Sequence, residues 1–194
     1  VRALIDSELL TYWKTAADSV LGARLLGPAE PKQLLIFGAG QVARALIDAY
    51  TTIFPSIATV TLCVRCLQSA DWLRQKLAAD ERRLTFALRV STEPAAVVPL
   101  ADIVATATTS ETPVLQGDWL TAGAHVDLVG AYTVSMREAD DNTLQRGALY
   151  VDCSDTTVDH IGELVVPLAS GAIKPDSILG DLYDLITQGP GDSG

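Results

Sequence analysis

Cysteine, histidine and basic residues are all scarce in this sequence. Its 194 residues include three cysteines and two histidines, and 14 Lys and Arg against 24 Asp and Glu give a formal net charge of −10. Three cysteines cannot form a regular disulfide framework, which favours reduced thiols and a cytoplasmic protein. The negative charge argues against nucleic acid or an anionic membrane surface as a partner.

Long hydrophobic runs are also missing. Gly, Pro or charged residues interrupt each apolar run before it could span a bilayer, and the N-terminus lacks the residue order of a signal peptide. We therefore expect no membrane segment. Hydrophobic residues still make up 48% of the sequence, enough for a sizeable core. The sequence begins at Val1 and not Met, and residues 188–194 form a Gly-rich loose tail, so we expect a piece of a longer protein.

Short apolar runs alternate with helical patterns along the chain. Strands are predicted at residues 33–37, 58–64, 84–90, 102–107, 123–129 and 148–152. Helices are predicted at residues 11–26, 41–54, 70–79 and 138–146. Strands that alternate with helices form a parallel sheet with helices on both faces. The prediction is an α/β fold with a doubly wound, Rossmann-type sheet that includes all six strands.

The pattern Gly38-x-Gly40-x-x-Ala43 lies between the first predicted strand and the helix that follows it. In dinucleotide-binding proteins the first glycine permits a tight turn, the second lets the pyrophosphate approach the main chain, and the third position needs a small residue for helix–strand packing. The helix N-terminus, here Gln41 and Val42, supplies N–H groups for phosphate. An ordinary strand–turn–helix corner is the alternative, but the six-strand pattern favours a nicotinamide dinucleotide site.

The tip of the second predicted strand carries a basic residue where NAD-binding proteins carry an acidic one. Residues 62–69 contain no Asp or Glu, and the next acidic residue, Asp71, falls inside the predicted helix. Arg65 is at the tip, and its planar guanidinium can pair with the 2′-phosphate of NADP. We therefore predict NADP(H) in preference to NAD(H). A solvated surface arginine is the alternative.

The pair Cys63-x-x-Cys66 has the spacing of half a metal site. No second cysteine pair or histidine cluster accompanies it, and on a strand the two side chains would point to opposite faces. We predict two small core or strand-end residues and no metal. His125, in a predicted strand, and His160, in a loop, lack a Ser or Cys partner and are predicted to be core or surface residues.

Several segments together resemble the ornithine cyclodeaminase/mu-crystallin family, from about residue 8 to about residue 185. They are KTAADS (14–19), GARLL (22–26), LIFGAG (35–40), ADIVATAT (101–108), PVL (113–115), GDWL (117–120), GAHVDLVGA (123–131), RE (137–138), VD (151–152) and GEL (162–164). The resemblance implies a two-domain enzyme, commonly a homodimer, in which a Rossmann domain holds NAD(P) and a second domain binds a small amino or imino acid.

The resemblance also implies a division of this sequence. Residues 1–30 are expected to be a helical lead-in that belongs in part to a substrate domain missing here, and residues 31–187 the NAD(P)-binding Rossmann domain. The family keeps its substrate-binding arginine and a lysine near the reacting carbon in the N-terminal third, which is absent. No catalytic residue is therefore assigned, and a homodimer is expected to form through the missing domain.

Residues beside the nicotinamide are predicted from their place at the carboxyl ends of strands. They are Thr106, Ala107, Thr108, Val129 and Gly130. The fourth strand leads to the first three, and the fifth strand leads to the other two.

One lysine is a candidate for binding the substrate carboxylate. Lys14 begins a segment in which the family usually has an arginine that grips this group. Lysine keeps the charge but lacks the bidentate fork of arginine. A solvated helix lysine is the alternative.

Three functions are compatible with these features. The first is an NAD(P)H-dependent reductase of cyclic imino acids of the Δ1-pyrroline-2-carboxylate or Δ1-piperideine-2-carboxylate type, which transfers hydride to a C=N bond. The second is an ornithine cyclodeaminase with bound NAD. Cyclodeaminases carry an Asp shortly after the Val129-Gly130 segment, whereas this chain has Ala131-Tyr132, which favours the reductase. The third is a non-catalytic dinucleotide-binding fragment or binding protein.

Overall fold

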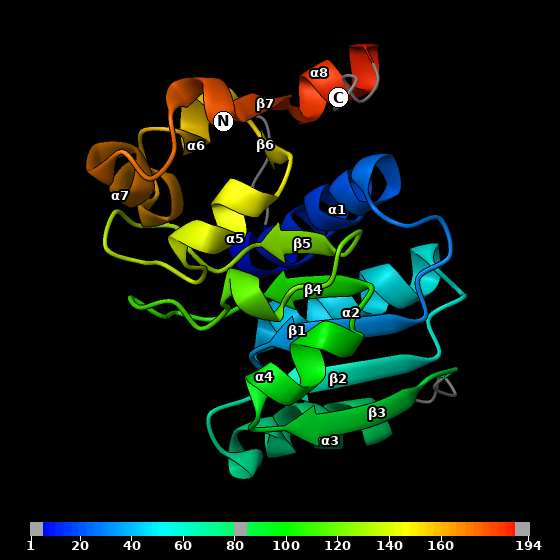
Figure 1. The fold of residues 1–194 in the computed structure, drawn as a ribbon. Helices are drawn as coiled ribbons and strands as arrows, with labels where there is room; N and C mark the ends of the chain where they lie inside the picture. Colours follow the sequence, from blue (N-terminus) through cyan, green and yellow to red (C-terminus); the bar gives the residue numbers. More distant parts are fainter. Residues whose placement is uncertain (1–5, 80–84, 189–194) are drawn as a thin grey trace.

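The centre of the molecule is a five-stranded parallel sheet (Figure 1). The structure, a computed structural model, describes residues 6–79 and 85–188. The strand order is β3-β2-β1-β4-β5, and each neighbouring pair is parallel. The strands are β1 (Gln33–Phe37), β2 (Thr59–Cys63), β3 (Ala87–Ser91), β4 (Ile103–Thr106) and β5 (His125–Leu128). The predicted α/β fold is confirmed. Residue 84, the predicted start of the third strand, lies outside the described residues.

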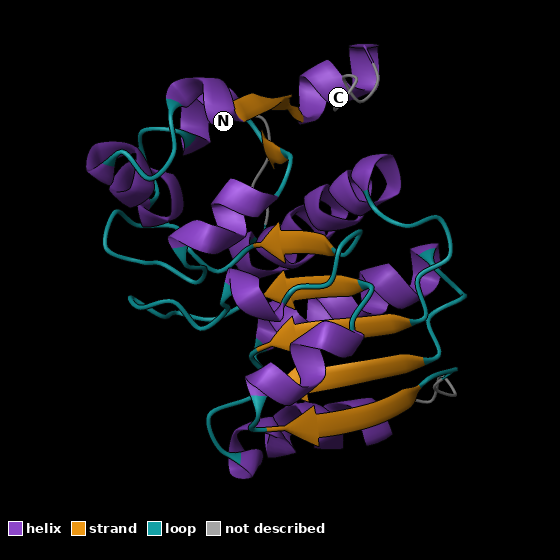
Figure 2. Cartoon of the chain, in the orientation of Figure 1, coloured by secondary structure: helices purple, strands orange, loops and turns teal. Residues whose placement is uncertain are grey.

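Helices cover both faces of the sheet (Figure 2). The longer helices lie on one face and are α1 (Ser7–Leu26), α2 (Gln41–Ile53) and α3 (Asp71–Ala78), with η1 (Leu67–Ala70) leading into α3. The other face is covered by the short helices α4 (Pro94–Val97), η2 (Val98–Leu100) and η3 (Gly117–Trp119). This two-sided cover is the doubly wound arrangement expected for strands that are buried on both faces.

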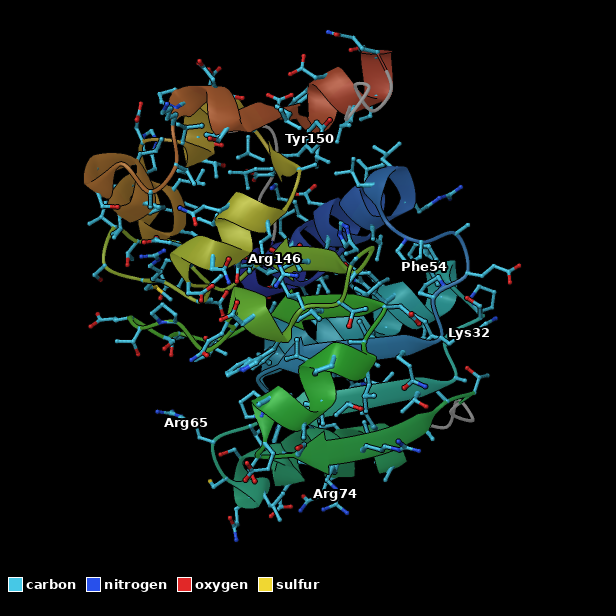
Figure 3. The ribbon with its side chains drawn as sticks, viewed as in Figure 1. Lys32, Phe54, Arg65, Arg74, Arg146 and Tyr150 are labelled. Carbon is cyan, nitrogen blue, oxygen red and sulfur yellow. The ribbon has the colours of Figure 1, made fainter. Side chains whose placement is uncertain are left out.

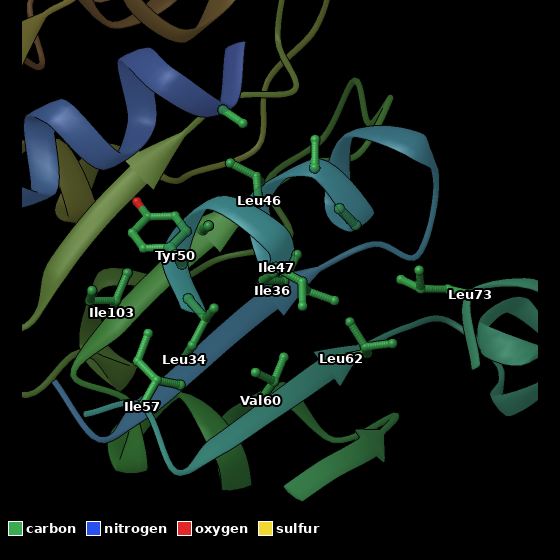
Figure 4. Close-up of a cluster of buried hydrophobic side chains, with 14 of the residues drawn as sticks. Leu34, Ile36, Leu46, Ile47, Tyr50, Ile57, Val60, Leu62, Leu73 and Ile103 are labelled. Atoms are coloured by element: carbon green, nitrogen blue, oxygen red, sulfur yellow. The ribbon is translucent and has the colours of Figure 1, made fainter. Parts of the chain in front are cut away.

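Each face of the sheet has its own buried layer, because successive strand residues point to opposite sides. In β1, Leu34 and Ile36 pack in the layer beneath α1 and α2, whereas Leu35 and Phe37 pack in the layer of the other face. Figure 4 shows the first layer, in which Leu46 of α2 lies over the sheet. All four β1 residues are at most 4% exposed. The continuous apolar run of β1 is therefore explained by burial on both sides.

The ends of the first two helices follow from local chemistry. The Asp6 side chain accepts a hydrogen bond from the Leu9 amide at 3.0 Å and caps the N-terminus of α1, which ends before Gly27. Helix α2 ends at Ile53, two residues before Pro55, whose ring prevents continuation.

A second, smaller sheet follows the first. It pairs β6 (Leu149–Val151) with β7 (Ile178–Asp181) in parallel and is surrounded by short helices. These helices are α5 (Asp141–Arg146), α6 (Ser154–Thr157), α7 (Gly162–Ser170), η4 (Pro175–Ser177) and α8 (Leu182–Gln188). The sixth predicted strand exists, but the expectation that it extends the main sheet is wrong. It packs instead in a separate cluster with Leu144, Leu164 and Ile173.

The segment before α5 also differs from the prediction. A helix was expected over residues 138–146, but α5 begins at Asp141. Glu138 and Ala139 precede it, and Ala139 forms an isolated parallel bridge with Leu115. Asp140 caps α5, because its side chain accepts a hydrogen bond from the Thr143 amide at 2.9 Å. The cap moves the helix start three residues along the chain.

None of the helices in residues 6–79 and 85–188 is long and apolar enough to cross a membrane.

Candidate functional site

The carboxyl ends of β1, β4 and β5 meet at one edge of the main sheet. The pairing continues past the last strand residues: the Ala107 amide donates to the Phe37 carbonyl at 2.8 Å, and the Val129 amide donates to the Thr106 carbonyl at 3.0 Å. The turn after β1 is attached on its other side, where the Gly38 amide donates to the Cys63 carbonyl at 3.0 Å. The structure thus brings together three segments that the sequence predicted separately.

The backbones of these segments are in direct contact. Gly38 has a φ of +107°, and a Cβ there would lie 2.5 Å from the Ala107 carbonyl oxygen. A Cβ on Gly130 would lie 2.6 Å from the Thr108 nitrogen and would also collide with the Thr108 carbonyl oxygen. Only glycine fits at either position. We call Gly38, Ala107, Thr108 and Gly130 the main-chain platform.

The N-terminus of α2 is open. Gly40 is its N-cap, with no side-chain cap and no acidic residue in the first turn. An added Cβ at Gly40 would meet nothing within 4 Å, so the space beyond this residue is free. The helical hydrogen bonds begin with the Arg44 amide, which donates to the Gly40 carbonyl at 3.1 Å. Gln41 is exposed, Val42 is half-buried and Ala43 is fully buried against the core.

Two predicted site residues lie away from the platform. Arg65 follows β2 by two residues, is exposed, and points away from the body of the chain (Figure 3). Lys14 is on α1, where its ammonium forms an ion pair with Asp18 at 2.6 Å. That hydrogen bond, with smaller contributions from Asp152 and Tyr183, raises the pKa of Lys14. The charged partners of Lys14 are therefore on α1 and beside the small sheet.

Sequence analysis missed the side chain that ties the platform together. Glu138 is fully buried and accepts four hydrogen bonds. Its Oε1 accepts from the Thr108 amide at 2.7 Å and the Thr108 hydroxyl at 2.6 Å. Its Oε2 accepts from the Thr106 hydroxyl at 2.7 Å and the Gly130 amide at 2.6 Å. The sequence points to Glu138 only through the RE segment of the family resemblance, and the helix predicted over residues 138–146 gives it no role in the site.

A second buried carboxylate supports the first. Glu163 Oε2 accepts a hydrogen bond from the Glu138 amide at 2.7 Å, and its Oε1 accepts from the Ala139 amide at 2.9 Å. Burial raises the pKa of Glu163, and these two backbone hydrogen bonds oppose that rise. The preceding residue, Gly162, is packed so closely that a Cβ would lie 2.6 Å from the Val134 carbonyl oxygen. Helix α7 is therefore anchored directly behind the platform.

A third buried acid connects β5 to the helices. The Tyr50 hydroxyl donates to Asp127 Oδ2 at 3.0 Å, and Ser19 of α1 also hydrogen-bonds to Asp127. Burial raises the pKa of Asp127 to about 6. The Tyr12 hydroxyl adds a second link between α1 and α2, because it donates to Asp48 at 2.6 Å. These bonds fix α1 on the sheet.

Comparison with known proteins agrees with this architecture. The model of the ornithine cyclodeaminase/mu-crystallin family matches residues 1–191. The chain belongs to this family. The match extends through both sheets and all the segments described above.

Named members of the family include several reductases. The chain is 50% identical over 189 residues to a Delta(1)-pyrroline-2-carboxylate reductase of Paracoccus denitrificans, covering 97% of this chain and 58% of that protein. It is 31% identical over 170 residues to the ketimine reductase mu-crystallin of Mus musculus, covering 88% of this chain and 51% of that one. The chain thus spans little more than half the length of these relatives.

Solved structures of the family share the fold. The Delta(1)-pyrroline-2-carboxylate reductase of Thermococcus litoralis, in complex with NADH and L-proline, matches with a TM-score of 0.85 and 24% identity over 92% of this chain and 54% of that one. A probable ornithine cyclodeaminase from Bordetella pertussis matches with a TM-score of 0.82 and 28% identity over 93% of this chain and 56% of that one.

Proposed function

We propose that this chain is the dinucleotide-binding part of an NAD(P)H-dependent reductase of cyclic imino acids, of the Δ1-pyrroline-2-carboxylate or Δ1-piperideine-2-carboxylate type. The observation that carries the proposal is the close contact of the loop after β4 with the Gly38 turn on one side and with the loop after β5 on the other, beside the open N-terminus of α2. The Paracoccus denitrificans relative, half of whose aligned residues are identical, is named for this reaction.

The residues present fit a nicotinamide dinucleotide. The free space at Gly40 and the uncapped N-terminus of α2 suit a pyrophosphate, which the amides of Gln41, Val42 and Ala43 would bind. The platform, with Thr106 and Val129, would lie beside the nicotinamide ring. The bound cofactor supplies the hydride. The chain orients the ring and excludes water from the carbon that receives it.

The identity of the cofactor depends on two charged residues near the end of β2. Arg65 is exposed and free to pair with a 2′-phosphate, which supports NADP(H). Glu93 would favour NAD(H) instead. Burial raises the pKa of the Cys63 thiol to about 11, and the negative charge of Glu93 contributes to the rise, which places Glu93 near the end of β2. Its carboxylate is the group suited to ribose hydroxyls and NAD(H). We favour NADP(H), since Arg65 is only two residues past the end of β2.

The residues after β5 favour reduction over cyclodeamination. Tyr132 is 72% exposed beyond the platform, where cyclodeaminases are expected to place an aspartate that works on the substrate amine. Without that carboxylate, hydride transfer to the C=N bond is the simpler chemistry. Lys14 is proposed to bind the substrate carboxylate once it leaves its pair with Asp18. Release of ammonia from ornithine would support the cyclodeaminase alternative.

We also propose a second, substrate-binding domain that packs on the α1 and α8 side. Residues 1–30 would belong partly to it, and residues 31–187 would form the Rossmann domain. Large apolar side chains are exposed on that side, namely Leu9, Leu10, Trp13, Tyr183 and Ile186. A homodimer formed through that domain, in the cytoplasm, with an imino or amino acid as the small-molecule partner, completes the proposal.

The first experiment is a titration of the full natural protein with NADPH and NADH, followed by nicotinamide fluorescence. We expect NADPH to bind more tightly, and Arg65→Ala to abolish that preference by weakening NADPH roughly 10- to 100-fold while leaving NADH unchanged. Glu93→Gln is the charge control.

The relative affinities for NADPH and NADH then distinguish the possible cofactor assignments. Tighter binding of NADH by the wild type, weakened in Glu93→Gln, would reverse the cofactor assignment. Cofactor binding without turnover of any cyclic imino acid would favour the non-catalytic alternative over the reductase.

A further inference from the structure

The Glu138 carboxylate is placed to set the spacing between the loops that follow β4 and β5. We propose that Glu138 is a positioning residue, which holds Thr108 and Gly130 in the arrangement that the nicotinamide ring and the imino carbon require. The inference rests on the proposed function, since it concerns the nicotinamide end of that same site.

The hydrogen-bond donors around Glu138 occupy all the acceptor positions of its carboxylate. Two donors come from Thr108, one from Thr106 and one from Gly130, at distances between 2.6 and 2.7 Å. A deprotonated carboxylate has about four acceptor positions, so none is left over. The side chain therefore connects two loops that do not share a strand, and it does so with short, charge-assisted bonds.

Both loops are bound through acceptor oxygens of Glu138. Oε1 accepts the main-chain N–H of Thr108, and Oε2 accepts the main-chain N–H of Gly130. Hydroxyl groups can rotate and become acceptors, but a main-chain N–H cannot. A glutamine would turn its NH2 group, which cannot accept a hydrogen bond, toward one of the two amides. One loop would then lose its anchor, whichever way the group is turned.

The main chain of Glu138 is also held in place, by Glu163 of α7 and by the later part of the loop after β4. Its amide donates to Glu163, and its carbonyl oxygen accepts from the amides of Val114 and Leu115 at 2.7 and 2.9 Å. Thr108 has one further tie, because its hydroxyl oxygen accepts from the Ser110 amide at 3.2 Å. Main-chain hydrogen bonds thus hold the backbone of Glu138, and its carboxylate binds the two loops.

The hydrogen bonds of the Glu138 side chain go to the loops after β4 and β5 and not to the turn after β1. That turn, with Gly40 and the N-terminus of α2, is where the pyrophosphate would bind. Loss of Glu138 should therefore disturb the nicotinamide end of the site and spare the adenine and pyrophosphate end. A displacement of about 1 Å at the reacting atoms lowers a rate by roughly 100-fold.

The test is Glu138→Gln in the full natural protein, with Glu111→Gln as the matched control. Glu111 is an exposed glutamate on the loop after β4, whose carboxylate accepts a hydrogen bond from Ser135 at 3.2 Å. For Glu138→Gln we expect kcat for imino acid reduction to fall roughly 10- to 100-fold while the Kd of NADPH changes less than about threefold. The control should match the wild type in both.

A second readout needs cofactor binding only. Nicotinamide fluorescence increases when the ring enters an ordered site, and we expect a smaller increase in Glu138→Gln at saturating NADPH. If that variant does not fold, Thr108→Val removes one hydroxyl donor and keeps the main chain, and Thr108→Ser should recover at least half of the lost kcat.

The outcomes separate the inference from the proposed function. An unchanged kcat and fluorescence in Glu138→Gln, or parallel losses of kcat and NADPH affinity, would overturn the positioning role while leaving the reductase intact. A wild type that binds neither cofactor overturns both. A wild type that binds NADPH without turnover overturns the reductase, and the fluorescence difference still decides the role of Glu138.

Discussion

At the scale of single residues, the main features are acidic side chains that differ in the hydrogen-bond donors around them. Glu138 is surrounded by four donors, and two of them are main-chain amides. Asp127 is less completely enclosed, and the side chains of Tyr50 and Ser19 hydrogen-bond to it. The cost of burial therefore dominates at Asp127 and raises its pKa to about 6. An acidic side chain thus binds main-chain amides at position 138 and has a raised pKa at position 127.

Asp127→Asn should change how stability depends on pH. Because the folded-state pKa is raised from 3.8 to about 6, ionisation of Asp127 opposes folding. Its contribution is most favourable below pH 4, declines as pH rises through about 6, and is constant above that. Asparagine can still accept the Tyr50 hydrogen bond and does not ionise.

The measurement is urea unfolding of both proteins from pH 4 to pH 8. Relative to the wild type, the variant should gain about 2 kcal/mol of unfolding free energy over this range. The difference between the two proteins removes the effect of His125, whose pKa burial lowers to about 4. A difference that stays constant with pH would contradict the assignment.

At the scale of elements, support for the site comes from α7 as much as from the main sheet. Glu163 in the first turn of α7 holds the amides of Glu138 and Ala139, one on each carboxylate oxygen. The small-sheet region is thereby connected to the platform through two short hydrogen bonds. The stability of α7 and the geometry of the site are expected to be coupled.

Glu163→Gln should lower the stability of the chain. Glutamine can accept one of the two main-chain N–H groups, and it leaves the other without an acceptor in a buried position. The expected cost is about 1–3 kcal/mol of unfolding free energy, seen as a lower urea midpoint with an unchanged slope. Glu93→Gln, at an exposed glutamate, should leave the midpoint in place. An unshifted midpoint in Glu163→Gln would show that the two hydrogen bonds make no net contribution to the unfolding free energy.

The sequence predicted the elements that repeat a strong pattern and missed those that do not. The buried run of β1, the glycine turn and the start of α2 at Gln41 are local features, and the structure places them as expected. The pairing of β6 with β7 depends on contacts between residues far apart in the chain, and β7 is short and includes Gly180 at a φ of +158°. The role of Glu138 could not be predicted from the sequence, because a main-chain amide can donate a hydrogen bond whatever side chain its residue carries.

At the scale of the whole molecule, exposed apolar side chains are concentrated on α1 and α8. They include Leu10 at 51%, Trp13 at 56% and Ile186 at 59% exposure. An exposed apolar group of this kind is typical of a surface that another domain or subunit covers. The family relative from Paracoccus denitrificans is longer than this chain, which covers 58% of it.

Leu10→Glu in the full natural protein should weaken the packing of the proposed substrate domain. Burying a charge at a domain contact is unfavourable, so we expect a lower thermal midpoint and a raised KM for the imino acid, with the Kd of NADPH unchanged. Leu100→Glu is the matched control, because Leu100 is 65% exposed on the opposite face of the sheet. Equal effects of the two substitutions would argue against a covering domain at α1.

The platform has a consequence for how such a site can change over evolutionary time. Its shape is set by main-chain atoms of Gly38, Ala107, Thr108 and Gly130, and most side chains nearby do not contribute to it. Exposed positions above it, such as Tyr132, can therefore accept new residues without refolding what lies beneath. We expect divergence of substrate among descendants of one ancestral protein to require only such surface replacements, with the two glycines and Glu138 retained.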